Sequence, residues 1–155
     1  MPYAADLSSA VQPGIWVLVI IVALLGFAVL VAKREQNRKA KIDAELPDGA
    51  WSATCLDAAV PSTKRLLIVT DDELAIAETR TGSRDSWPWP EIAGVEIKNL
   101  RVRLQSYPGL RIELADGHAR ELLVYIGEGK SSYQAGATAA YERITAHLPR
   151  STRPQ

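Results

Sequence analysis

The hydrophobic pattern is densest near the start of the chain, where residues 14–32 contain no charged side chain. Thirteen of these nineteen residues are strongly apolar, and at ~0.3 to 0.6 kcal/mol each near a helix centre they favour membrane insertion by about 4 to 8 kcal/mol. Nineteen residues at about 1.5 Å of rise per residue span about 28 Å, which is close to the hydrocarbon thickness of a bilayer. The pattern therefore predicts a single transmembrane helix over residues 14–32.

The charges on the two sides of this run are unequal. Asp6 is the only charged residue before it. The residues just after it, 33–41, include one acidic side chain, Glu35, and five basic ones: Lys33, Arg34, Arg38, Lys39 and Lys41. The positive-inside rule then predicts a single-pass plasma-membrane protein with its N-terminus outside and its C-terminal part in the cytoplasm. A cleaved secretory signal has the opposite order, with basic residues before the apolar core. The basic residues either contact anionic lipid head groups or only set the topology, and the sequence leaves both interpretations open.

Residues 33–46 lack Gly and Pro and consist largely of good helix formers, so the membrane helix is expected to continue through them. Pro47, Asp48 and Gly49 form a turn signature that ends it. We therefore expect the following organisation: an extracytoplasmic N-terminus at 1–13, the span at 14–32, a basic helical linker at 33–48, one domain at 49–148 and a tail at 149–155.

Beyond residue 49 the pattern changes to short apolar segments separated by turn residues. Several alternate strictly between apolar and polar positions, which is typical of antiparallel strands with one solvated face. We expect strands or strand-like segments at 51–56, 66–70, 74–77, 92–97, 100–104, 110–114 and 121–126, with an edge or bend at 86–90 and turns at 71–73, 106–109 and 116–117. Apolar residues then recur at helical spacing from Tyr133 to Leu148, with Ser131 or Ser132 as the expected N-cap. The domain is thus predicted to contain about seven strands and one closing helix.

This order of elements resembles the bacterial pleckstrin-homology-like and GRAM-like domains. The resemblance is carried by a hairpin with the sequence Leu-Leu-Ile-Val-Thr-Asp-Asp-Glu-Leu-Ala-Ile at 66–76, a corner with the sequence Trp-Pro-Trp-Pro-Glu-Ile-Ala-Gly-Val at 87–95, and the C-terminal amphipathic helix. It implies an α+β fold, in which a transmembrane helix precedes a mainly antiparallel β-sheet or partly open barrel of about seven strands, capped by the last helix. A membrane helix before such a domain is similar to the arrangement in small actinobacterial membrane proteins. These signatures contain no catalytic residue.

The composition offers little for catalysis, metal binding or nucleic-acid binding. The net charge is zero, the region beyond residue 50 is not basic overall, and the only Cys and His residues are Cys55, His118 and His147. Nucleophilic catalysis needs a base beside a nucleophile, and a metal site needs a cluster of ligands, so we expect neither an enzyme nor a cofactor. The Gly-Lys-Ser at 129–131 resembles the end of a phosphate-binding loop, but position 124 is Val where that loop needs Gly, and we expect no nucleotide. No nucleic-acid partner is expected either.

The most notable polar set is Lys98, Arg101 and Arg103. On a strand the two arginines would share one face, and Leu100, Val102 and Leu104 the other. Phosphoinositide-binding pleckstrin-homology domains use a similar Lys and basic-x-basic pattern, but between their first two strands, where this chain has only Lys64 and Arg65. Two hypotheses follow: a non-enzymatic scaffold or accessory subunit that holds a protein partner at the cytosolic face, or a sensor of anionic lipid that uses the basic linker with Lys98, Arg101 and Arg103. The sequence leaves the oligomeric state open.

Overall fold

The structure, a computed structural model, describes residues 8–127 and 129–149. The expected extracytoplasmic residues 1–7 and the tail beyond Pro149 lie outside the described residues. The chain divides into two compact units, one that ends at Lys41 and one that starts at Ile42. The second unit thus starts before residue 49, where the sequence places the domain boundary.

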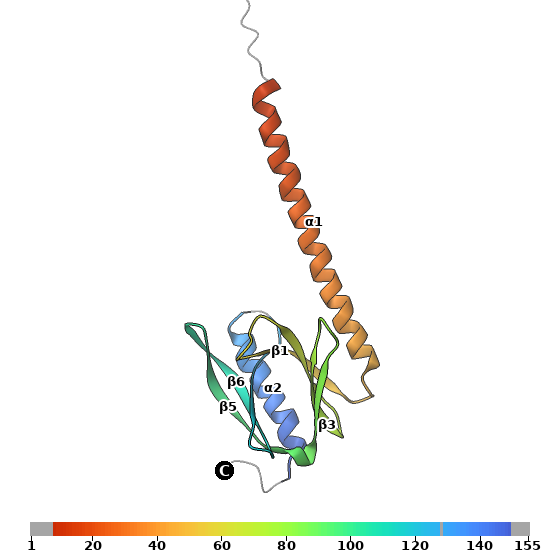
Figure 1. Cartoon of the computed structure of the whole chain (residues 1–155), viewed down its shortest axis with the longest axis vertical. Coiled ribbons are helices and arrows are strands. Elements are labelled where there is room, and N and C mark those ends of the chain that lie inside the picture. Colours follow the sequence, from red (N-terminus) through yellow and green to blue (C-terminus); the bar gives the residue numbers. More distant parts are fainter. Residues whose placement is uncertain (1–7, 128, 150–155) are drawn as a thin grey trace, which may run out of the picture. The chain divides into compact units, whose positions relative to one another are not determined.

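The first element is a helix, α1, which runs from Ser8 to Glu45 (Figure 1). It starts before the expected span and continues through the basic residues, because no Gly or Pro interrupts it between Phe27 and Leu46. Its segment Ile15–Ala44 reaches a mean hydropathy of 3.1 in its most apolar window. Within the described residues, this is the one helix long and apolar enough to cross a membrane.

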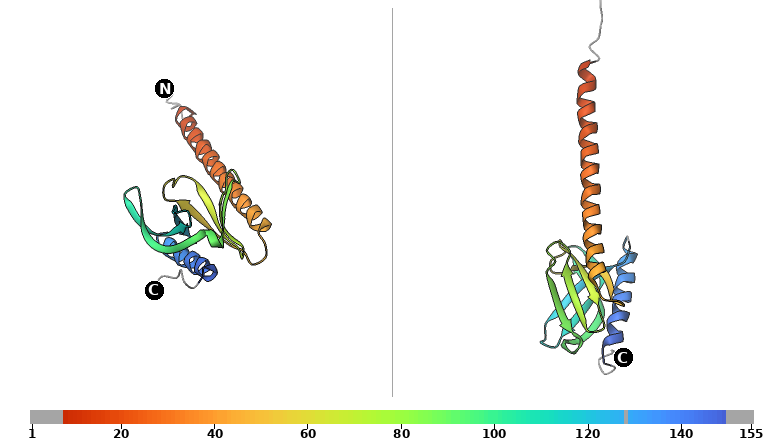
Figure 2. Two further views of the ribbon diagram at one scale, coloured as in Figure 1. Left: turned by 60° about the horizontal axis from the view of Figure 1, so that its bottom comes forward. Right: turned by 90° about the vertical axis from the view of Figure 1, so that its right-hand side faces the viewer.

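The second unit contains a seven-stranded antiparallel sheet that curls into a half-barrel (Figures 1 and 2). The strands are β1 (Trp51–Asp57), β2 (Lys64–Val69), β3 (Glu73–Glu78), β4 (Arg84–Pro88), β5 (Ile92–Val102), β6 (Gln105–Leu114) and β7 (Ala119–Tyr125). Their spatial order is β4-β3-β2-β1-β7-β6-β5, so β4 and β5 are the two edges. A short 3₁₀ helix, η1 (Trp89–Glu91), joins the two edge strands, and the helix α2 (Ser131–His147) closes the domain. The predicted α+β class, with about seven antiparallel strands capped by a C-terminal helix, is confirmed.

The main core lies between the inner face of the sheet and α2 (Figure 2). Cys55, Leu110 and Val124 from the sheet are completely buried in it, as is Ile144 from the helix. Helix and sheet approach so closely at Gly136 that a Cβ atom there would overlap the carbonyl group of Val124. Glycine is therefore the residue that lets α2 lie against β7.

A second, smaller cluster occupies the other face of β2 and β3. It contains four buried residues, Leu66, Ile68, Ala75 and Ala77, and two half-buried residues pack against it, Ile42 and Leu46. The Ser52 hydroxyl also donates a hydrogen bond to the Asp43 carboxylate at 2.7 Å. The central parts of β2 and β3 are therefore buried on both faces, because residues from the end of α1 cover the face that the sheet would otherwise expose.

The predicted turn at 106–109 is wrong. These residues lie in β6, and the chain reverses at Arg103 and Leu104, where Arg103 adopts a left-handed conformation with φ of 56°. Pro108 is tolerated in the strand because it precedes the ladder between β6 and β7, which begins at Leu110, so no bond to β7 needs the N–H that proline lacks. Gly109 is needed because a Cβ atom there would lie 2.8 Å from the backbone carbonyl oxygen of Leu122 and 2.5 Å from the side chain of Leu100 on β5.

Two further expectations differ from the structure. The strands expected at 92–97 and 100–104 form one continuous strand, β5, with a bulge between Ile92 and Gly94. Neither Ser131 nor Ser132 is the N-cap of α2: that position is Lys130, and the Ser132 hydroxyl instead donates to the carbonyl oxygen of Gly129 at 2.6 Å. By contrast, the segment expected to form an edge or bend at 86–90 is confirmed, since β4 is an edge strand that ends at Pro88.

Candidate functional site

The tip of the β5–β6 hairpin carries the most exposed large apolar side chain of the domain. Leu104 is 89% exposed, and Arg103 beside it is also exposed. The prediction that Arg101 and Arg103 share one strand face while Leu104 lies on the other is wrong, because residues 103 and 104 form the turn. Arg101 remains on β5, and Lys98 is exposed near the middle of the same strand. Lys98 and Arg101 thus lie on the same strand, whereas Arg103 lies in the turn.

A hollow that we call the tip pocket lies beside this turn. It has a volume of about 490 Å³ and is lined by residues from β1, the loop after it, the β5–β6 hairpin, β7 and α2: Leu56, Pro61, Val102, Arg103, Leu104, Gln105, Tyr107, Leu123 and Tyr133. The rings of Tyr107 and Tyr133 lie 4.9 Å apart between centroids, and that of Tyr125 lies 5.7 Å from Tyr133. The wall of the tip pocket is therefore mainly apolar and aromatic, and Arg103 is the charged residue that lines it.

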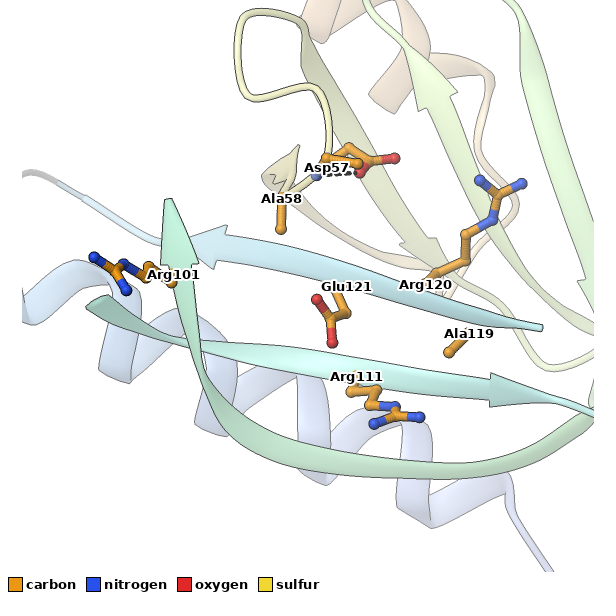
Figure 3. A pocket seen from close by; sticks show the side chains of 8 residues that line it. Asp57, Ala58, Arg101, Arg111, Ala119, Arg120 and Glu121 are labelled. Carbon is orange, nitrogen blue, oxygen red and sulfur yellow. Dashed lines mark hydrogen bonds between the residues drawn. The ribbon is translucent and has the colours of Figure 1, made fainter. Parts of the chain in front are cut away.

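A second hollow, which we call the arginine basin, contains Arg101 together with arginines that the sequence did not single out (Figure 3). Its volume is about 470 Å³, and the lining residues are Asp57, Ala58, Ala59, Arg101, Arg111, Ala119, Arg120 and Glu121. Figure 3 shows that Arg101 stands at one end of the hollow, while the Arg120 side chain points toward the opposite end. The lining residues come from the end of β1, the following loop, and strands β5, β6 and β7.

Among the described residues, two of the five charged side chains of the arginine basin, Asp57 and Arg111, form ion pairs, and a third, Arg120, lies over an aromatic ring. Arg111 lies 3.4 Å from the Glu113 carboxylate and 3.9 Å from that of Glu96. Asp57 pairs with Arg65 at 3.2 Å, and the guanidinium of Arg120 lies 5.6 Å from the centre of the Trp87 ring. Within the part of the chain that the structure describes, Arg101 and Arg120 form no ion pair. A polyanionic head group needs several cations converging on one point, whereas Arg101 stands at one end of the basin and the Arg120 side chain points toward the other (Figure 3).

The other residues expected to contact anionic lipid lie on α1. Lys33, Arg34, Arg38 and Lys41 are exposed, and Lys39 is half-buried. They belong to the unit that ends at Lys41, so the structure assigns them no common site with Lys98, Arg101 or Arg103.

The two histidines and the cysteine lie in unrelated places. His147 stacks on Trp89, with ring centres 4.6 Å apart and planes inclined by 8°, and the Trp89 Nε1 donates to the Asp71 carbonyl oxygen at 2.9 Å. His118 is exposed after the turn between β6 and β7. Cys55 is completely buried, and this burial raises the pKa of its thiol to about 12, so the reactive thiolate does not form near neutral pH. Across residues 8–127 and 129–149, no group of three His, Cys, Asp or Glu side chains could hold a metal ion.

Comparison with known proteins finds a distant structural similarity and no family. No protein-family model matches the chain, and no curated protein matches it. Among solved structures, the chain is similar to the hSac2 domain from the human phosphoinositide phosphatase Sac2, with 13% identity and a TM-score of 0.47, over 77% of this chain and 92% of that one. A likeness of this size says nothing about the ligand of this chain. The curled seven-stranded sheet, the closing helix and the apolar helix before them fit a pleckstrin-homology-like fold with one candidate membrane span.

The sequence missed the tip pocket and the basin for the same reason. Their residues come from segments as far apart as Leu56 and Tyr133, and only the pairing of β1 with β7 and the packing of α2 bring those segments together. The one available signal was the apolar Leu104 in a basic stretch, which the strand alternation assigned to a buried face.

Proposed function

We propose that the protein is a non-enzymatic, single-pass membrane protein whose pleckstrin-homology-like domain holds a protein partner at the cytosolic face of a bacterial plasma membrane. It would act as a scaffold or an accessory subunit of a membrane-associated assembly. The apolar helix supports the membrane location, and the five basic residues after it support the orientation with the N-terminus outside.

The observation that carries the proposal is the tip pocket with Leu104 beside it. Protein interfaces are centred on apolar and aromatic anchors in pockets, and Tyr and Arg are enriched among the residues that dominate binding. The tip pocket combines Tyr107, Tyr133 and Arg103 with a leucine that the described part of the domain leaves uncovered. Val60, in the loop that also supplies Pro61 to the pocket, adds a second exposed apolar side chain.

Site-specific photo-crosslinking in cells tests this proposal. A benzophenone amino acid in place of Leu104 should give a discrete protein adduct, whereas the same amino acid in place of the exposed Asp72, in the turn between β2 and β3, should not. Adding Arg103→Glu should reduce the adduct, because Arg103 lines the pocket. Equal adducts at both positions, or none at position 104 at native expression, would contradict the proposal.

A second candidate function is contact with an anionic membrane surface. It is favoured by one observation, the exposed Leu104 next to Arg103 and close to Arg101, since an apolar tip flanked by exposed cations suits the boundary between head groups and acyl chains. Lys98 and the linker residues Lys33, Arg34, Arg38, Lys39 and Lys41 would add attraction of about 1 kcal/mol each near such a surface.

The lipid hypothesis has a separate test on the full chain in lipid nanodiscs. A Leu104→Cys variant should react with a water-soluble maleimide more slowly in anionic than in neutral nanodiscs, and high salt should remove the difference. Arg101→Glu with Arg103→Glu should remove it as well. Equal labelling rates in both lipids at low salt would rule out this function.

A further inference from the structure

We infer that the free edge of β5 pairs with the same strand of a second copy of this chain, in antiparallel register centred on Ile97. This inference is independent of the tip pocket, and it makes the protein a homodimer with a continuous sheet across the two domains.

The middle of β5 is exposed on both faces. Four consecutive residues, Glu96, Ile97, Lys98 and Asn99, are exposed, so neither face of this segment is covered. Ile97 is 41% exposed. The strand is eleven residues long and lies at the edge of the sheet. In the described part of the chain, none of the backbone hydrogen bonds formed outside helices and strand ladders involves residues 92–102.

The backbone groups that face outward can be assigned from the pairing with β6. Val102 pairs with Gln105 across a two-residue turn, and such a closing pair exchanges its hydrogen bonds. The bonding alternates along an antiparallel ladder, so Asn99 opposite Pro108 falls on a non-bonded position, as the missing N–H of proline requires. Ile97 lies two residues before Asn99, so it also falls on a non-bonded position of the ladder with β6. Both residues therefore direct their N–H and C=O groups toward the free edge.

The side chains of this edge are complementary to themselves. In an antiparallel pair centred on Ile97, each residue lies opposite the residue at the mirrored distance from the centre, so Glu96 of each copy faces Lys98 of the other. Ile97 faces Ile97, and Val95 faces Asn99. The N–H and C=O groups of these residues point toward the free edge and would form the hydrogen bonds between the two copies. The pair thus joins two opposite-charge contacts and one apolar contact, the combinations that stabilise cross-strand neighbours.

The neighbouring registers lack this match. A pair centred on Lys98 would place the two ammonium groups directly opposite each other, and like charges in that position are destabilising. A pair centred on Asn99 would place Glu96 opposite Val102 and leave both carboxylates without a cation. Confinement of two copies to one membrane by α1 would raise their effective concentration and favour the pairing.

Disulfide trapping of the full chain in native membranes tests the register. Hydrogen-bonded antiparallel partners have Cα atoms about 5.5 Å apart, within the range of about 4.4 to 6.8 Å that a disulfide needs. Ile97→Cys should therefore give a crosslinked dimer on mild oxidation. Asn99→Cys is the matched control, because two copies of residue 99 would be offset by four residues, about 14 Å, and should not crosslink. The native Cys55 is completely buried and contributes no crosslink of its own.

Charge exchange provides a second readout that does not depend on cysteine. Glu96→Lys alone places Lys opposite Lys twice, and Lys98→Glu alone places Glu opposite Glu twice, so each single variant should lose about threefold or more in dimerisation constant. Coexpression of the two variants restores both opposite-charge contacts, and a mixed dimer should form in preference to either homodimer. Lys98→Glu is the cleaner single change, because Glu96 also lies 3.9 Å from Arg111 in its own domain.

Crosslinking at position 97 but not at 99, together with preferential mixed dimers, is the expected result. Absence of a crosslink at 97, equal crosslinking at 97 and 99, or random mixing of the charge variants would each overturn the inference. None of these failures bears on the adduct at Leu104, so the proposed partner site would stand or fall separately.

Discussion

The packing of the end of α1 on the sheet predicts that a fragment starting at residue 47 is much less stable than one starting at residue 42. Ile42 and Leu46 cover a surface formed by Leu66, Ile68 and two alanines. Complete burial of an Ile or Leu side chain contributes about 1.5 to 3 kcal/mol, and both residues are half-buried, so together they contribute about 1.5 to 3 kcal/mol. Their removal would also expose a row of apolar side chains on β2 and β3, a surface prone to association.

The assay is urea unfolding of fragments 42–155 and 47–155, followed by tryptophan fluorescence. With an m-value of about 1.5 kcal/mol/M, the shorter fragment should unfold at a urea concentration lower by about 1.5 M, and in buffer it should bind a hydrophobic dye. In the longer fragment, Ile42→Ala should account for about half of the loss. Glu45→Ala, an exposed neighbour on the same helical turn, is the control and should change the free energy of unfolding by less than about 0.5 kcal/mol. Equal midpoints for the two fragments would refute the reasoning.

Three further predictions concern the core. Gly136→Ala should destabilise the domain by about 1 to 3 kcal/mol in thermal or urea unfolding, because the new methyl group overlaps the Val124 carbonyl and forces α2 away from β7; Gly94→Ala, with open space around it in the same domain, is the control and should cost less than about 0.5 kcal/mol. Cys55 should resist thiol reagents until the domain unfolds, and rapid labelling at pH 8 without unfolding would contradict this. Burial raises the pKa of its thiol from 9.0 to about 12, so the free energy of unfolding that depends on the neutral thiol should be fully present below about pH 9 and should fall as the pH rises toward 12. Trp89→Phe should cost about 1 to 2 kcal/mol, because it leaves the carbonyl oxygens of Thr70 and Asp71 without the indole donor, and an unchanged unfolding midpoint would show that those bonds contribute nothing.

Local patterns were sufficient for much of the fold. The helical spacing from Tyr133 to Leu148 correctly placed Ala137, Ala140 and Ile144 in the core, and the Asp116-Gly117 signal lies in the connection between β6 and β7. These features depend on neighbours within one or two turns of the chain, which is the range that periodicity and turn chemistry describe.

The failures have tertiary causes. Pro108 and Gly109 form a strong turn signature, yet the strand continues through them. Pro108 precedes the ladder with β7 and so needs no N–H there, and Gly109 lies against Leu100 and the Leu122 carbonyl oxygen, where a side chain would not fit. The chain turns instead at Arg103 and Leu104, which carry no turn signature. The contacts of the basin arginines involve Glu96 and Trp87, which are distant in sequence from Arg111 and Arg120. The tip pocket likewise combines distant segments, so strand alternation alone could not identify either hollow.

The central claim is that one span holds the domain on the cytosolic side of the membrane, and site-specific labelling tests it most directly. The full chain with Asp72→Cys, an exposed turn position, would be treated with a membrane-impermeant maleimide in intact cells and again after permeabilisation. The native Cys55 is buried and should not be labelled in either treatment. Labelling only after permeabilisation is the predicted result, whereas a variant with Ser9→Cys should react in intact cells. Labelling of the Asp72→Cys variant in intact cells would place the domain outside and contradict the account.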